Sequence, residues 1–287
     1  MEKSDSSVSV PAPDTGFIHA LFNSTNDARI AHLSRILTTS SGVDTTLTLV
    51  GYSLYFVHAQ LNRLQNFNLK ALAERVAANA SKSLNPGETV VATFPLPGPM
   101  SRIEDLKAAT KGLAGMCSDF RAFTRLWGLL AIWAWAKRTY LAPPKDEILK
   151  TVAWAQIAAN ASYLVFENGY YLAGKGVLRG WTPQKQKRWA LLSLRMFLGH
   201  VALEFVRLWR TRQLREEKRY LGEEKEDKIA RTQEEKAWWR TSYIYAAYTP
   251  LAVHWAIDGG FLSDDLVGAL MTCVGLVKFR AAWKQTA

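Results

Sequence analysis

The sequence has 287 residues, 48% of them hydrophobic, and its excess of Lys and Arg gives a formal net charge of +11. High apolar and high basic content together suit a protein that works on a bilayer with anionic headgroups, because each cation near such a surface gains about 1 kcal/mol. Nucleic acid is the other common partner of basic proteins, but the strongest basic run, residues 207–240, interleaves acidic side chains that would repel phosphate. We therefore expect membrane lipids as partners and no nucleic acid.

Neither end of the sequence carries a targeting signal that we can identify. Residues 1–16 predict a disordered tail, because they are rich in Ser and Pro and lack the features of a secretory or mitochondrial signal. Residues 284–287 match no lipidation motif and no soluble peroxisomal import tripeptide. Any targeting signal is therefore expected inside the chain.

Residues 17–84 predict an N-terminal helical region. Asn26 or Asp27 is expected to cap a first helix, and Asp44 is expected to cap the next one. Residues 45–62 contain no charged side chain, and these roughly 18 residues approach the roughly 20 that a spanning helix needs. Their Thr, Ser, His and Gln content favours a buried core helix over a span.

The stretch 57–82 has the periodicity of an amphipathic helix, with apolar side chains on one face at about 100° per residue. Its cations outnumber its only acidic residue, Glu74, and a basic polar face suits anionic lipid. Such a helix either closes on a protein core or lies in the membrane interface, and both interpretations stay open. In the second, the lipid-binding residues are Leu61, Leu64, Leu69, Leu72, Val76, Arg63, Lys70, Arg75 and Lys82.

Residues 85–100 predict a Pro-rich linker and a domain boundary, because no helix or central strand tolerates such a density of breakers. The remainder, 101–287, predicts a helical membrane region. Its expected parts are helices over about 102–111, 120–141, 145–172 and 183–207, a charged segment at 207–240 and a hairpin at 241–277.

The helix expected over 183–207 carries three polar residues, Arg195, His200 and Glu204, within otherwise apolar turns. It is either the core helix of a soluble protein or a membrane helix whose polar residues face protein. The pattern alone does not decide between these two.

The C-terminal hairpin is the clearest feature, since residues 241–257 and 266–277 are uncharged and an acidic turn separates them. Cations flank the outer ends and none lies in the turn, so the positive-inside rule places both outer ends in the cytosol. A soluble helix pair is the alternative, because the second arm covers only about 18 Å. The residues assigned to this membrane hairpin are Pro250, His254, Trp255, Gly259, Gly260, Asp264, Asp265, Gly268 and Gly275.

No set of residues predicts catalysis. The five histidines are never four residues apart, and two cysteines, Cys117 and Cys273, are too few for a Cys-based metal site. The sequence also lacks the GxSxG, GxGxxG and P-loop patterns. Glu167, which follows an uncharged run, is either a buried acid or the point where a helix leaves the apolar layer. We expect no enzyme, no metal and no cofactor.

Several short strings of the sequence occur in a recognisable order. They lie at residues 118–129, at Gln156, Asn160 and Tyr163 leading into 167–173, at 176–178, at 250–255 before Gly259 and Gly260, and at 267–269 before 275–276. In this order they resemble the peroxin-11 family, whose members are peroxisomal membrane proteins that promote elongation and division of the organelle. Residues 41–44 before Leu47 and Tyr52 are similar to a divergent fungal subtype.

The resemblance covers most of the chain and implies a place in the peroxisomal membrane, with the termini facing the cytosol. It implies that the protein remodels this membrane and promotes peroxisome division and proliferation, with residues 57–82 in the position of the family's remodelling helix. We expect a homo-oligomer and contacts with fission machinery. Two alternatives stay open: a metabolite pore lined by Glu167, Arg195 and Glu204, and an adaptor that recruits fission machinery through residues 207–240.

Overall fold

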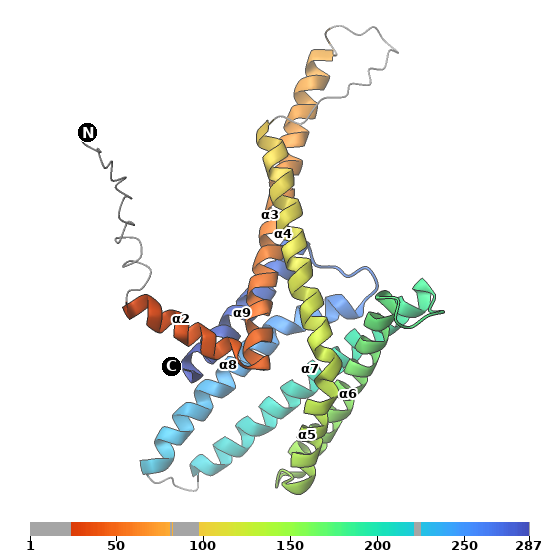
Figure 1. Ribbon diagram of the computed structural model, residues 1–287. Coiled ribbons are helices and arrows are strands. Elements are labelled where there is room, and N and C mark those ends of the chain that lie inside the picture. The colour runs from red at the N-terminus through yellow and green to blue at the C-terminus, as the bar shows by residue number, and fades with distance from the viewer. Residues whose placement is uncertain (1–23, 81, 83–97, 221–224, 287) are drawn as a thin grey trace, which may run out of the picture.

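The computed structural model describes residues 24–80, 82, 98–220 and 225–286, and every regular element within them is a helix (Figure 1). The predicted all-α fold class is therefore confirmed. Helices α3 and α4 form a long antiparallel pair that extends beyond the group formed by the other helices (Figure 1). The predicted tail at 1–16 and most of the predicted linker lie outside the described residues.

The first two helices are α2 (Ser24–Leu37) and α3 (Ser40–Ala80). The expected cap of the second one was wrong, because the Thr39 hydroxyl accepts from the backbone N–H of Gly42 at 3.0 Å and α3 begins before Asp44. The Asp44 carboxylate is thereby free to pair with Arg121 on α4 at 2.8 Å. Residues 57–82 are not a separate helix, since α3 runs through from the uncharged segment without a break.

Helix α4 (Gly98–Thr124) is longer than the short helix expected at 102–111, and the last three residues of the predicted linker form its start. Pro99 fits there because the first turn of a helix has no use for its missing N–H. A 3-10 turn, η1 (Arg125–Trp127), separates α4 from α5 (Gly128–Leu141), so the predicted helix at 120–141 was wrong at its boundaries.

The next helices pack as antiparallel neighbours. Asp146 caps α6 (Glu147–Gly174) by accepting from the backbone N–H of Leu149 at 2.9 Å. Helix α7 (Pro183–Tyr220) extends beyond the predicted end at 207, and α8 (Lys225–Ala256) begins within the predicted charged segment. That segment therefore forms the ends of two long helices around their connection.

The last helix, α9 (Asp264–Gln285), begins after Ser263 and packs along the first part of α3 in the opposite direction. Buried Leu251, Val267 and Met271 form a core between α8 and α9, against which the partly buried Tyr52 and Tyr55 of α3 pack. Helix α3 contacts both α4 and α9, so the N-terminal region and the C-terminal hairpin are joined in one packed unit.

Beyond the last contact of α3 with α9, α4 is the one helix among the described residues that lies beside the rest of α3. We call residues 61–80 of α3, together with residues 98–110 of α4, the stalk (Figure 1). The stalk was not predicted, because the pattern of residues 57–82 does not say which neighbour covers the apolar face.

Candidate functional site

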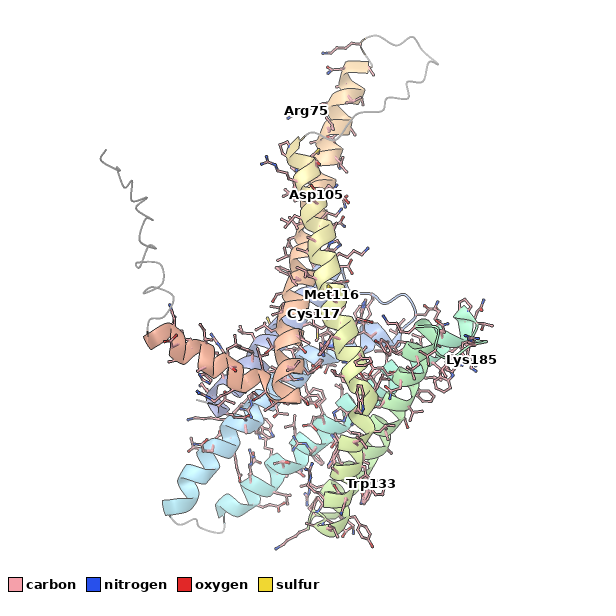
Figure 2. All side chains as sticks on the ribbon, in the orientation of Figure 1. Arg75, Asp105, Met116, Cys117, Trp133 and Lys185 are labelled. Carbon is pink, nitrogen blue, oxygen red and sulfur yellow. The ribbon has the colours of Figure 1, made fainter. Side chains whose placement is uncertain are left out.

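A stripe of exposed apolar side chains runs along one face of α4, η1 and α5. Its members are between 47% and 73% exposed, although large apolar groups are normally covered in a soluble monomer. Figure 2 labels two of them, Met116 on α4 and Trp133 on α5. At 1.5 Å per residue the stripe covers about 30 Å, which is the thickness of a bilayer's hydrocarbon core. The apolar stripe consists of Leu113, Met116, Phe120, Phe123, Trp127, Leu130 and Trp133.

Each charged side chain on this stretch of chain has a partner on another helix or directly after one. Asp119 pairs with Lys175 at 2.5 Å and Arg121 pairs with Asp44 at 2.8 Å. The third, Arg125, pairs with Glu167 of α6, whose side chain is 6% exposed. Pairing with a neighbouring helix is how membrane helices tolerate ionised residues, because an unpaired charge in hydrocarbon costs several kcal/mol.

Polar side chains between α6, α7 and α8 likewise bond to one another inside the protein. The Glu204 carboxylate, on a residue only 5% exposed, accepts from Gln156 Nε2 at 2.7 Å and from Arg207 Nε at 2.9 Å. Helix α7 therefore turns Glu204 toward protein. His200, Asn160 and Tyr245 complete this polar cluster. Nδ1 of His200 lies 2.8 Å from Asn160 Nδ2, and Nε2 lies 3.0 Å from Tyr245 Oη.

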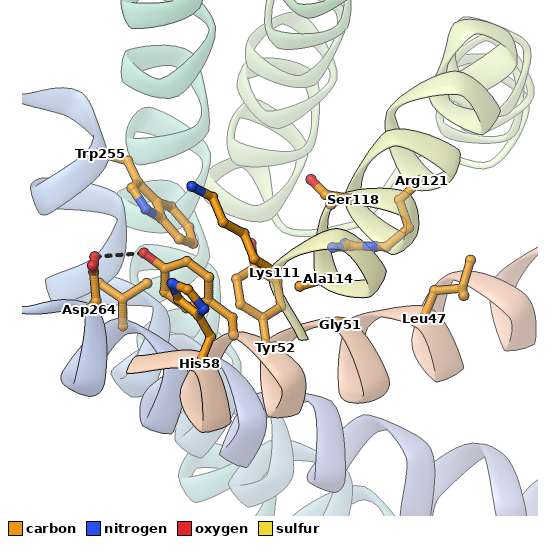
Figure 3. A pocket seen from close by; sticks show the side chains of 13 residues that line it. Leu47, Gly51, Tyr52, His58, Lys111, Ala114, Ser118, Arg121, Trp255 and Asp264 are labelled. Carbon is orange, nitrogen blue, oxygen red and sulfur yellow. Dashed lines mark hydrogen bonds between the residues drawn. The ribbon is translucent and has the colours of Figure 1, made fainter. Parts of the chain in front are cut away.

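Three of the predicted hairpin residues, His254, Gly259 and Gly260, shape the turn between α8 and α9. His254 Nδ1 accepts from the backbone N–H groups of Phe261 at 2.7 Å and Leu262 at 2.8 Å, which closes the turn onto the end of α8. Gly259 and Gly260 have φ values of +83° and +61°, a conformation that favours glycine. Pro250 lies inside α8, and Trp255 on the same helix faces α3 and α4 across the cavity in Figure 3.

The two acidic residues at the start of α9 fasten it to α3. Asp264 accepts from the Tyr55 hydroxyl at 2.6 Å, and Asp265 accepts from Gln60 Nε2 at 2.7 Å. The predicted hairpin glycines lie farther along α9, where the helices touch. A Cβ on Gly268 would lie 2.8 Å from Phe56 Cα, and one on Gly275 would lie 2.8 Å from Leu49 Cα. The hairpin therefore packs against α3 rather than standing alone.

The acidic turn also has cations near it that the sequence does not place there. Lys187, at the start of α7, pairs with Asp258 at 2.6 Å. The start of α7 therefore lies beside the hairpin turn, and residues 175–188 around it contain five Lys and Arg side chains.

The apolar residues among the predicted lipid-binding set divide into an exposed and a half-buried group on the stalk. Leu64 and Leu69 are 47% and 39% exposed, and Phe67 beside them is 70% exposed. By contrast, Leu61, Leu72 and Val76 are half-buried. The four predicted cations Arg63, Lys70, Arg75 and Lys82 are all exposed, with Arg75 labelled in Figure 2.

Among the described residues, two helices are long and apolar enough to cross a bilayer: α7 over Pro183–Glu217 and α9 over Asp264–Gln285. The core helix of a soluble protein passes the same test but is mostly buried. Here only 17% and 28% of the most apolar stretches of α7 and α9 are buried in the protein. Among the described residues, no group of three or more His, Cys, Asp or Glu could hold a metal ion.

Sequence reasoning missed the apolar stripe and the pairs between helices. The stripe could have been found from its period, since its members are three or four residues apart from 113 to 133. The pairs could not, because Arg125 and Glu167 are 42 residues apart and only the packing of α6 brings them together.

Comparisons with known proteins gave no relative: no family model, no curated protein and no solved structure matches this chain.

Proposed function

We propose that this chain is a helical membrane protein that remodels a bilayer, and that it acts in the peroxisomal membrane to promote elongation and division of the organelle. The observation that carries the membrane part is the apolar stripe together with the paired charges on α4 and η1. A surface that exposes aromatic rings over about 30 Å, while its charges pair with other helices, suits hydrocarbon better than water. The low burial of α7 and α9 adds to this.

The peroxisomal part of the proposal rests on the resemblance in the sequence. The strings that carry it fall on structurally connected parts: residues 118–129 include Arg125, residues 167–173 begin with its partner Glu167, and Gly268 and Gly275 contact α3. Some of the residues that resemble the family thus join helices to one another.

In the proposed mechanism, apolar side chains on the stalk part of α3 insert into one leaflet and expand it. Leu64, Phe67 and Leu69 are exposed on the stalk, and inserting such groups about 5–10 Å at the headgroup boundary favours curvature. Exposed cations on the same helix would hold anionic lipid.

A metabolite pore is less well supported, because its predicted lining residues are engaged within the protein. Glu167 and Glu204 are 4% and 5% exposed and both are bonded to arginine. Arg195 Nε donates to the backbone oxygen of Ala256 at 3.3 Å.

Three measurements test the proposal. A fluorescent fusion should decorate the rim of peroxisomes, and carbonate extraction should leave the protein in the membrane pellet. Full-length protein reconstituted into anionic vesicles should draw them into tubules. Release by carbonate would contradict the membrane part, and conductance across planar bilayers without tubulation would favour the pore.

A further inference from the structure

A cavity of about 530 Å³ lies between α3, α4 and the junction of α8 with α9 (Figure 3). Its volume falls in the range of small-molecule sites, which is about 300–1,000 Å³. Its walls combine aromatic and aliphatic groups with a few polar ones. The lining includes Leu47, Tyr52, Val267 and Trp255 on the apolar side, and Lys111, Ser118 and Arg121 on the polar side.

The ionised side chains in the lining of this cavity are Lys111, Arg121 and Asp264, and Arg121 is already paired with Asp44. Lys111 is exposed, extends into the cavity in Figure 3 and makes no hydrogen bond or ion pair with any described residue. The guanidinium of Arg121 and the hydroxyl of Ser118 face the same space (Figure 3). Asp264 is the only carboxylate among the lining residues, and it already accepts from the Tyr55 hydroxyl. Lys111 is therefore the cation that an anion in this cavity would meet unpaired, because Asp264 bonds Tyr55 and Asp44 bonds Arg121.

Small residues keep the cavity open along α4. Gly115 lines it, and a Cβ built on this glycine meets no atom within 4 Å. The lining follows α3 from Leu47 to His58, which at 1.5 Å per residue is about 16 Å. This length exceeds what a single phosphate group would need and suits an elongated amphiphile.

The cavity lies at the boundary that the proposed membrane placement defines. Lys111 precedes the apolar stripe by two residues, and Trp255 and Asp264 flank the hairpin turn. Tryptophan, tyrosine and lysine are the residues that membrane proteins place at headgroup level.

We propose that this cavity binds one glycerophospholipid with an anionic headgroup, its phosphate at Lys111 and Ser118 and the start of an acyl chain along Gly115 and Leu47. The proposal rests on the membrane placement argued above. It adds a specific lipid site on the face of α4 opposite the apolar stripe. The chemistry recognised is a phosphate ester on an apolar body, so both the lipid and free phosphate must be tested.

Native mass spectrometry of the full-length protein in a nonionic detergent tests the site, with phosphatidic acid and phosphatidylcholine added in equal amounts. We expect one retained phosphatidic acid per chain and little phosphatidylcholine. Lys111→Ala should weaken retention about fivefold, the change expected from one cation near anionic lipid. Gly115→Leu should abolish it by filling the cavity. Lys137→Ala, which removes an exposed cation of α5 outside the cavity, is the matched control and should change nothing.

The site would be overturned by equal retention of the two lipids, by equal effects of Lys111→Ala and Lys137→Ala, or by unchanged retention in Gly115→Leu. Complete displacement by millimolar inorganic phosphate would show that the free anion is the ligand and would also overturn it. Because the experiment uses detergent micelles, it can fail while carbonate extraction and tubulation still support the proposed function.

Discussion

Arg125 and Glu167 form a two-pronged ion pair that joins η1 to α6: Nε donates to Oε2 at 2.7 Å and Nη2 donates to Oε1 at 2.9 Å. Removing one partner leaves a charge in an apolar environment, which typically costs about 3–5 kcal/mol, whereas replacing both with apolar groups costs little. We therefore expect Glu167→Leu and Arg125→Met each to lower the thermal unfolding temperature strongly, and the double variant to recover most of it.

The comparison of single and double variants is made by thermal unfolding in detergent. Lys150→Met, at an exposed pair within α6, is the control and should have little effect, because exposed pairs contribute at most about 1 kcal/mol. Additive losses in the double variant would show that Arg125 and Glu167 do not act as a pair.

The close approach of α9 to α3 gives a second prediction. A side chain at Gly268 would meet the backbone of Phe56, which cannot move aside as a flexible side chain can. We expect Gly268→Val to force the helices apart and destabilise the protein by at least the roughly 1–3 kcal/mol of core overpacking. Gly112→Val on α4, where a Cβ meets nothing within 4 Å, is the matched control. Equal losses in both variants would mean that helix propensity, rather than helix contact, sets the cost.

The exposed apolar residues of the stalk give the third prediction. Leu64→Glu with Phe67→Glu should leave the fold intact, because both side chains are already exposed, and should strongly reduce vesicle tubulation. Each buried apolar side chain contributes about 1.5–3 kcal/mol to insertion, against about 1 kcal/mol for a surface cation. Lys70→Ala should therefore weaken tubulation only in part and make it more sensitive to salt. Unchanged tubulation in the double variant would remove the stalk from the mechanism.

The two stalk helices are also linked by a polar contact that depends on pH. Hydrogen bonds from Gln65, at 2.5 Å, and from Lys107 hold the pKa of Glu104 below its ordinary value of 4.5. A lowered pKa means that the contact stabilises the folded stalk fully above that value. The contribution is lost as pH falls below 4.5 through the folded-state pKa.

Spin labels at Arg63 and Asp105, both exposed, would report this change as a distance between α3 and α4 in the full-length protein. We expect the distance distribution to broaden as pH falls below about 4.5. Glu104→Gln should remove this pH dependence, because the amide does not titrate in this range. A pH response that survives in Glu104→Gln would assign the effect to another group.

The helix period and the turn residues were sufficient to predict an all-α chain and the hairpin turn with its paired glycines, because both are local properties. The predicted helix boundaries were wrong where a contact with another part of the fold decides where a helix begins. Asp44 looks like a helix cap in the sequence, but Thr39 is the cap and Asp44 pairs with Arg121. The division into domains depended on prolines, which do not show that α3 on one side of them packs against α4 and α9 on the other.

The last prediction concerns topology, and it follows from the direction of α3 relative to α9. Leu49 lies at Gly275 and Phe56 lies at Gly268, so the two helices run side by side in opposite directions. If α9 crosses the bilayer, the uncharged segment 45–62 crosses beside it, and the stalk emerges on the same side as the hairpin turn. His32 on α2 bonds the backbone oxygen of Trp283 at 2.8 Å, which places α2 at the other end of α9.

Cation placement gives the orientation, although less simply than the hairpin alone suggests. The Lys187–Asp258 pair places cations of the α6–α7 connection near the turn, and the stalk adds more. The opposite end contains the charged segment 207–240 and the cations after residue 277, which together are richer in Lys and Arg. We therefore expect this opposite end to face the cytosol.

Protease protection of tags on intact peroxisomes measures this arrangement. A tag after Ala287 should be digested by added protease, while tags after Gly259 and after Lys82 should be protected until detergent is present. The position after Gly259 is chosen because it is exposed and leaves the Ser263 cap of α9 in place. Digestion at Gly259 without detergent would show that the hairpin does not span. Digestion at Lys82 alone would show that α3 leaves α9 before the far side, which would put the stalk on the cytosolic surface.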